Sequence, residues 1–64
     1  MKIKSFKNGW EVSLEKNKEI GYKLPYMVRL RDSAGELRDK IACDSYSGAL
    51  SYYKSFCKIA NNGV

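Results

Sequence analysis

The stretch SFKNGWEVSL, Ser5–Leu14, places an Asn-Gly pair between two segments in which apolar and polar residues alternate. Asn8-Gly9 is typical of a two-residue hairpin turn, because a type I′ turn requires positive φ at both central residues. We therefore predict a strand over Ile3–Lys7 and a second strand over Trp10–Glu15. Because side chains alternate along a strand, one face of the second strand carries the apolar residues Trp10, Val12 and Leu14.

The length of the predicted turn also fixes the pairing of the two strands. A two-residue loop places Lys7 opposite Trp10, Ser5 opposite Val12 and Ile3 opposite Leu14. The next segment, Lys16–Pro25 (KNKEIGYKLP), is polar and is predicted to be a loop. Its apolar residues are expected to lie against the rim of the core; they are Ile20, Tyr22 and Leu24.

A second hairpin follows. YMVRLRD, Tyr26–Asp32, alternates clearly, and LRDKIACD, Leu37–Asp44, is the returning strand. DSAGE between them suits a type I turn with a G1 bulge at Gly35. Leu30 then pairs with Leu37. Asp39 falls on the apolar parity of its strand, and a bulge or an edge position would explain it.

From Tyr46 the period of the apolar residues becomes helical. Ser45 is a favourable N-cap residue, and Asn61–Gly63 end the helix. The helix buries one apolar stripe, made of Ala49, Leu50, Tyr53, Phe56, Cys57 and Ala60. We therefore predict one α+β domain over residues 1–64, with a three- to four-stranded antiparallel sheet packed on one face by a single C-terminal helix.

Composition excludes several function classes. The 64 residues contain two cysteines and no histidine, so the usual general base and most metal-site patterns are missing. Cys43 and Cys57 are expected to be reduced, buried thiols. We predict no catalytic residues, no metal, no cofactor, no small-molecule substrate and no membrane span, and a cytoplasmic location. The net charge of +5 favours an acidic partner.

The sheet face that the helix leaves uncovered is the predicted binding surface. Its expected residues are Glu11, Ser13, Glu15, Met27, Arg29, Arg31, Arg38, Lys40 and Ala42. The pairing above sets Arg29 opposite Arg38, an unfavourable arrangement that a phosphate partner would relieve. The alternative is that Glu11 and Glu15 pair with Arg29 and Arg31, which leaves a solvated surface of mixed charge.

The aromatic residues bear on the kind of nucleic acid. A site for single strands exposes aromatic platforms among basic residues. Here the aromatic residues Trp10, Tyr26, Tyr53 and Phe56 all fall on the core side. Duplex DNA is therefore the favoured nucleic acid. Tyr52 and Ile59 flank the helical stripe and form a small second patch.

Three segments together resemble AP2-like DNA-binding domains, which include the arm-type N-terminal domains of phage and transposon tyrosine recombinases. They are KNGWEVSL, YMVRLRDSAGELRDKI and CDSYSGA. The resemblance implies that Arg29, Arg31, Arg38 and Lys40 meet DNA and that Lys2 and Lys4 form an auxiliary basic arm. The sequence departs from the family at Cys43, Gly48, the Lys16–Pro25 insertion, Glu11 and Glu15.

The leading prediction is a non-catalytic DNA-binding module that uses the uncovered sheet face and comes from a phage or mobile element. The alternative is a small protein-interaction module, a phage-type inhibitor or adaptor of a host protein. It would use the same face, with Met27 exposed, or a free edge strand.

Overall fold

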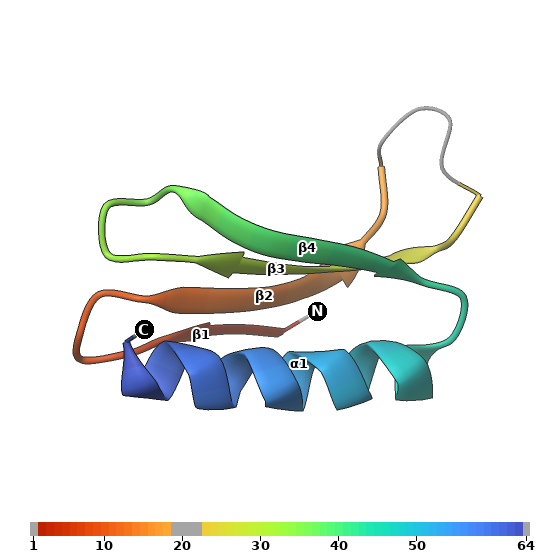
Figure 1. The fold of residues 1–64 in the computed structure, drawn as a ribbon. Helices are drawn as coiled ribbons and strands as arrows, with labels where there is room; N and C mark the ends of the chain where they lie inside the picture. Colours follow the sequence, from red (N-terminus) through yellow and green to blue (C-terminus); the bar gives the residue numbers. More distant parts are fainter. Residues whose placement is uncertain (1, 19–22, 64) are drawn as a thin grey trace.

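A single antiparallel sheet carries one helix on one of its faces. The computed structural model describes residues 2–18 and 23–63. Its elements are β1 (Lys2–Ser5), β2 (Glu11–Lys16), β3 (Tyr26–Arg31), β4 (Leu37–Cys43) and α1 (Tyr46–Asn62). The strands are ordered β1-β2-β3-β4, so β1 and β4 are the edges (Figure 1). The predicted α+β fold is confirmed.

The core lies between α1 and the inner strands β2 and β3. The predicted apolar face of β2 is buried, with Val12 fully inaccessible and Leu14 1% exposed. The rest of the core cluster is Trp10, just before β2, and residues of the other elements: Val28, Leu30, Cys43, Ala49, Phe56 and Ala60. Burying a Val, Leu or Phe side chain contributes about 1.5–3 kcal/mol each, so this apolar contact is the main stabilising term.

Both ends of α1 are capped as predicted. The Ser45 hydroxyl accepts a hydrogen bond from the Gly48 N–H at 3.1 Å. A Cβ on Gly48 would lie 3.1 Å from that hydroxyl oxygen, so the glycine leaves the cap room. At the other end Gly63 has φ 68°, and its N–H bonds to the carbonyls of Ile59 and Ala60. This left-handed residue stops the helix.

The first hairpin turn is longer than predicted. The Phe6 N–H donates to the Trp10 carbonyl at 2.8 Å, and the Gly9 N–H donates to the Phe6 carbonyl at 2.9 Å. Only Gly9 has positive φ, at 91°, whereas a type I′ turn requires it at Asn8 as well. The turn is therefore a three-residue loop that ends in a left-handed glycine, and the predicted two-residue turn is wrong.

One extra loop residue shifts the whole of β1. Lys4, rather than Ser5, lies opposite Val12, and Lys2, rather than Ile3, lies opposite Leu14. Opposite residues share a face, so Lys2 and Lys4 point to the helix side of the sheet, and Ile3 points to the uncovered side, 66% exposed. The predicted faces of β1 are therefore exchanged.

The second hairpin has the predicted turn but a different pairing. Asp32 accepts hydrogen bonds from Ala34 and Glu36 through its side chain, and Gly35 has φ 83°. A β-bulge then separates the pair Arg31–Leu37 from the pair Leu30–Asp39. Arg29 therefore faces Lys40, so the predicted pairs Leu30–Leu37 and Arg29–Arg38 are wrong.

Hydrogen bonds join the two ends of the long connection between β2 and β3. The Asn17 backbone N–H donates to the Pro25 carbonyl at 2.8 Å, and its side-chain amide donates to the Leu24 carbonyl at 2.8 Å. Leu24 is 38% exposed, so it is not held firmly against the core. The expected positions of Ile20 and Tyr22 lie outside the described residues.

One side chain joins the first turn to the end of the helix. The Asn8 amide nitrogen donates to the Ala60 carbonyl at 2.7 Å, across 52 residues of sequence, and its oxygen accepts from the Trp10 N–H at 3.1 Å. Carbonyls in the last turn of a helix lack the usual partners, and Asn8 gives the Ala60 carbonyl a second, shorter hydrogen bond beside that from Gly63. Asn8 thereby closes the open end of the layer between the sheet and α1.

We expect Asn8→Asp to lower the free energy of unfolding by about 2 kcal/mol. Aspartate still accepts from Trp10, but it cannot donate to Ala60 and places a negative charge at the negative end of the helix dipole. Asn62→Asp carries the same charge change at an exposed position of the same helix end and is the matched control. Urea unfolding measures both, and equal losses would contradict a specific role for the Asn8 donor.

The two turn glycines provide a second matched pair. A Cβ on Gly9 would lie 3.0 Å from the Ser33 Cβ in the neighbouring turn, whereas a Cβ on Gly35 would meet nothing within 4 Å. Both substitutions to alanine carry the cost of positive φ, about 1–2 kcal/mol. We expect Gly9→Ala to lose more stability than Gly35→Ala in urea unfolding, because only Gly9 also has the steric contact. A larger loss at Gly35 would overturn this assignment.

Candidate functional site

The uncovered sheet face has a mixed charge. Arg29 lies opposite Lys40, but its guanidinium is 3.7 Å from the Glu15 carboxylate. Arg31 lies directly opposite Glu11 on β2. Three cations and two carboxylates leave this face with a formal charge of only +1. The Glu15–Arg29 pair follows the mixed-charge alternative, and each such pair contributes little, about 0–1 kcal/mol.

Met27 is on this face but is not available to a partner. It is fully buried, and it lies on an inner strand between Glu15 of β2 and Ala42 of β4. Ser13 is also buried, at 6% exposure. The expectation of an exposed Met27 is therefore wrong, because neighbours on both sides cover a residue of an inner strand.

Arg38 lies away from the other predicted binding residues. Its guanidinium carbon is 5.9 Å from the centre of the Trp10 ring, and its nitrogen is 3.6 Å from the Asp32 carboxylate. Since Trp10 belongs to the core beneath α1, Arg38 has turned to the helix side. The bulge explains this, because the unpaired residue of a bulge leaves the regular alternation. The same bulge sets Leu37 opposite Arg31 on the uncovered side, 43% exposed.

Of the six predicted binding residues, the structure brings Arg29, Arg31 and Lys40 together on the uncovered face. Arg38 is separated from them by the bulge. Lys2 and Lys4 belong to the helix side, because the first turn has one more residue than predicted.

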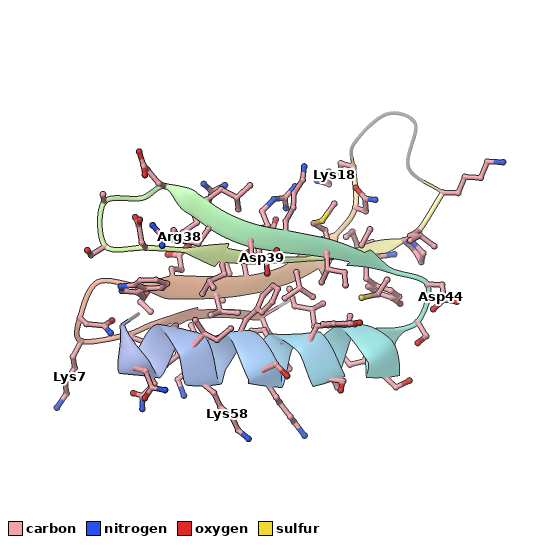
Figure 2. All side chains as sticks on the ribbon, in the orientation of Figure 1. Lys7, Lys18, Arg38, Asp39, Asp44 and Lys58 are labelled. Atoms are coloured by element: carbon pink, nitrogen blue, oxygen red, sulfur yellow. The ribbon has the colours of Figure 1, made fainter. Side chains whose placement is uncertain are left out.

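A second basic surface lies on the helix side. All seven acidic residues of the chain fall between Glu11 and Asp44, so neither β1 nor α1 contains one. Five lysines lie on these elements and the first turn, and we call them the lysine surface: Lys2, Lys4, Lys7, Lys54 and Lys58. None of the five forms an ion pair with another described residue. Figure 2 shows Lys7 and Lys58 pointing away from the sheet, on the side opposite Lys18.

The helical lysines belong to the side of α1 next to β1. Lys54, Lys58 and Asn61 are spaced i, i+4 and i+7, which places them in one row along the helix. Asn61 lines a pocket together with β1 residues, so this row borders β1. The row that contains Lys54 and Lys58 therefore ends beside Lys4 and Lys7.

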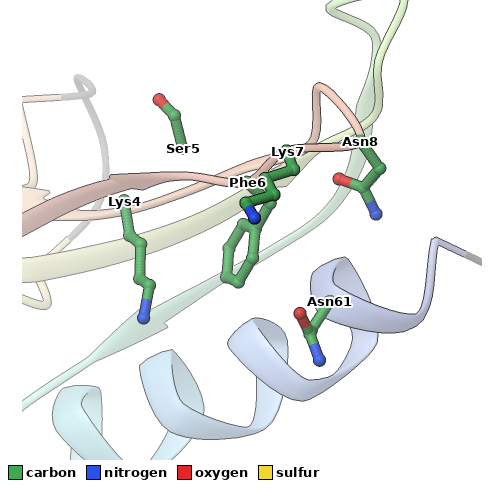
Figure 3. A pocket seen from close by; sticks show the side chains of 6 residues that line it. All are labelled: Lys4, Ser5, Phe6, Lys7, Asn8 and Asn61. Carbon is green, nitrogen blue, oxygen red and sulfur yellow. The ribbon is translucent and has the colours of Figure 1, made fainter.

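The pocket at this boundary is open and has a volume of about 500 Å³. Lys4 and Phe6 extend from the β1 side toward α1, and Asn61 lies on the last turn of the helix across from them (Figure 3). The complete lining is Lys4, Ser5, Phe6, Lys7, Asn8 and Asn61. The Lys4 ammonium lies 5.4 Å from the centre of the half-buried Phe6 ring. The pocket thus combines two cations, two amides and one aromatic face.

The sequence contained part of the signal for this site. The confinement of acids to Glu11–Asp44 and the spacing of Lys54, Lys58 and Asn61 are both readable without a structure. The position of Phe6 is not, because its face depends on the turn length. The prediction from sequence centred on the arginines of the second hairpin. It included Lys2 and Lys4 only as an auxiliary arm and did not include Lys7, Lys54 or Lys58.

Two titratable side chains of the core, Cys43 and Tyr53, have shifted pKa values. Burial, with a smaller effect of Asp44, raises the pKa of the Cys43 thiol, and burial followed by Cys57 raises the pKa of Tyr53. A raised thiol pKa lowers the thiolate fraction, and only the thiolate is a good nucleophile. Within residues 2–18 and 23–63, no three His, Cys, Asp or Glu side chains are grouped to hold a metal ion.

Comparisons of the chain with protein-family models, with curated proteins and with solved structures find no match. The similarity to AP2-like domains therefore stays a prediction from sequence pattern. In the described part of the chain, no helix has the length and apolar character needed to cross a bilayer.

The raised pKa of Cys43 predicts a stability change in alkaline solution. The thiol in the unfolded chain ionises near its ordinary pKa of 9.0, before the buried thiol does. Stability is therefore complete below that pH and falls as the pH rises toward the folded pKa. We expect Cys43→Ala, measured by urea unfolding between about pH 8 and pH 9.5, to reduce this fall. A pH profile identical to that of the wild type would contradict it.

Proposed function

We propose that this chain is a non-catalytic DNA-binding module whose lysine surface contacts the phosphate backbone. The observation that carries the proposal is the separation of charge. Five lysines lie on the helix side of the molecule, β1 and α1 contain no acid, and none of the five forms an ion pair with another described residue. DNA offers the matching array of closely spaced negative charges.

The uncovered sheet face and the lysine surface differ in what DNA would have to displace. On the uncovered sheet face, Arg29 and Arg31 already face Glu15 and Glu11, so DNA would have to approach carboxylates as well as cations. On the lysine surface no cation forms an ion pair with another described residue, so phosphate would displace water and mobile counterions rather than a carboxylate. Release of condensed counterions is the main source of affinity in such contacts. The lysine surface is therefore the stronger candidate.

The uncovered face remains a second surface for the same partner. Arg29 lies opposite Lys40, and Arg31 lies two residues along β3 on the same side. This is the face that the resemblance to AP2-like domains assigns to DNA. Arg38 is not part of it, since the bulge turns that side chain toward Trp10.

A protein partner is the second candidate, favoured by the outer edge of β4. Among the described residues β4 pairs only with β3, and Leu37 is 43% exposed on it. A free edge permits an added strand from another protein. The bulge and the charged residues Arg38 and Asp39 disfavour such pairing, because proteins use these features to protect edges.

We expect the double variant Lys54→Gln/Lys58→Gln to bind a labelled 20-base-pair duplex more weakly and with a smaller salt dependence. Each lost phosphate contact lowers the slope of log K against log salt by about 0.9, so the change is nearly 2. Fluorescence anisotropy over a salt series measures it. Lys18→Gln/Lys23→Gln has the same charge change on the connection between β2 and β3, and we expect its slope to stay unchanged.

Arg29→Gln/Lys40→Gln tests the uncovered face in the same assay. If this variant alone loses the slope, the sheet face is the binding surface and the assignment to the lysine surface is wrong. Absence of binding to DNA at about 50 mM salt, or binding that salt does not weaken, would reject the DNA proposal altogether, since phosphate contacts require counterion release.

A further inference from the structure

An open pocket between β1 and α1 is bordered by residues of the lysine surface. Its volume of about 500 Å³ lies within the range of roughly 300–1,000 Å³ of small-ligand pockets. A flat patch of lysines holds a backbone from outside, whereas this pocket admits a chemical group between the strand and the helix. The residues that line the pocket indicate which part of a nucleic acid it could hold.

The lining favours a base together with its phosphates. The Phe6 ring packs partly against the core and carries the Lys4 ammonium 5.4 Å from its centre, but part of it lines the pocket. A nucleobase that displaces this ammonium can stack on the ring, and the freed lysine can then meet a phosphate. Lys4 and Lys7 precede and follow Phe6 in sequence, so cations flank the ring on both sides along the chain. Aromatic residues interleaved with basic ones are the recurring arrangement of proteins that bind single strands.

Asn61 supplies the polar group at the opposite wall. The amide of Asn8 is occupied at both ends, by Ala60 and by Trp10. No described residue forms a hydrogen bond with the side chain of Asn61, which is exposed and lines the pocket. Its carbonyl and NH₂ groups remain available to the edge of a base, since an amide can both donate and accept.

We propose that this pocket holds one unpaired nucleotide of DNA, with its base on Phe6, its phosphates at Lys4 and Lys7, and its edge at Asn61. The inference rests on the proposed DNA-binding function and adds the structure of the DNA. A base within a duplex has both faces stacked and cannot lie on Phe6. The chain therefore binds a single strand more tightly than the same sequence in a duplex.

The test compares a labelled 12-nucleotide strand with its duplex by fluorescence anisotropy at low salt. Phe6→Leu keeps an apolar side chain against the core but removes the ring. We expect this variant to weaken binding of the single strand by about tenfold or more, because one stacked base supplies an affinity of that order. The duplex affinity should change less than twofold. Asn61→Ala, at an exposed position, should weaken the single strand several-fold.

Tyr52→Leu is the matched control. Tyr52 is 45% exposed on α1 and lies nine residues before Asn61, about two and a half turns, so it is on the opposite side of the helix. We expect this variant to bind both DNAs like the wild type. Circular dichroism verifies that each variant is folded, and if Phe6→Leu fails to fold, Asn61→Ala and Lys4→Gln decide the question.

The outcomes separate the two proposals. If the wild type binds DNA but Phe6→Leu and Asn61→Ala leave the single-strand affinity unchanged, or weaken both DNAs equally, the nucleotide pocket is rejected and the DNA-binding function stands. If the wild type prefers the duplex, the pocket is also rejected. If neither DNA binds at low salt, both proposals fail.

Discussion

The hydrogen bonds around Asn8 determine how the rest of the molecule is arranged. The Phe6–Trp10 backbone bond closes a three-residue loop, and this loop sets which side of the sheet each residue of β1 faces. The Asn8 side chain then holds the loop against the last turn of α1 through Ala60. Trp10 lies beneath this junction and is buried. One turn therefore fixes the register of an edge strand and the position of the helix end, and the pocket lies between the two.

The inner strands and the helix were predictable because their burial patterns are strong. Val12 and Leu14 alternate with polar residues on β2, and Ala49, Phe56 and Ala60 repeat at helical spacing. A one-residue slip in such an element would expose its apolar side chains, so the pattern alone identifies the face. The capping residues Ser45 and Gly63 are similarly local signals, readable from the sequence.

The edge strands were not predictable in the same way. Every residue of β1 is exposed, so burial does not specify its register, and the turn decides it instead. Asn-Gly is compatible with both turn lengths, because Gly9 has positive φ in either. On β4 the bulge exchanges the sides of Leu37 and Arg38. The one sign of this bulge in the sequence is Asp39, a charged residue at an apolar position of the alternation. These two registers decide the sides of Lys2, Lys4 and Arg38, which therefore differ from the prediction. Arg29, Arg31 and Lys40 lie on the uncovered face as predicted.

The lysines of β1 could serve to protect an edge strand instead of binding a partner. The lysines of the helix distinguish these two explanations. Proteins place lysines on edge strands to prevent pairing with other chains, and this alone would account for Lys2 and Lys4. It does not account for Lys54 and Lys58, because a helix presents no unpaired backbone edge. Nor does it account for the absence of acidic residues from α1. Both elements carry the same sign of charge along a shared boundary, which is the pattern a common anionic ligand would favour.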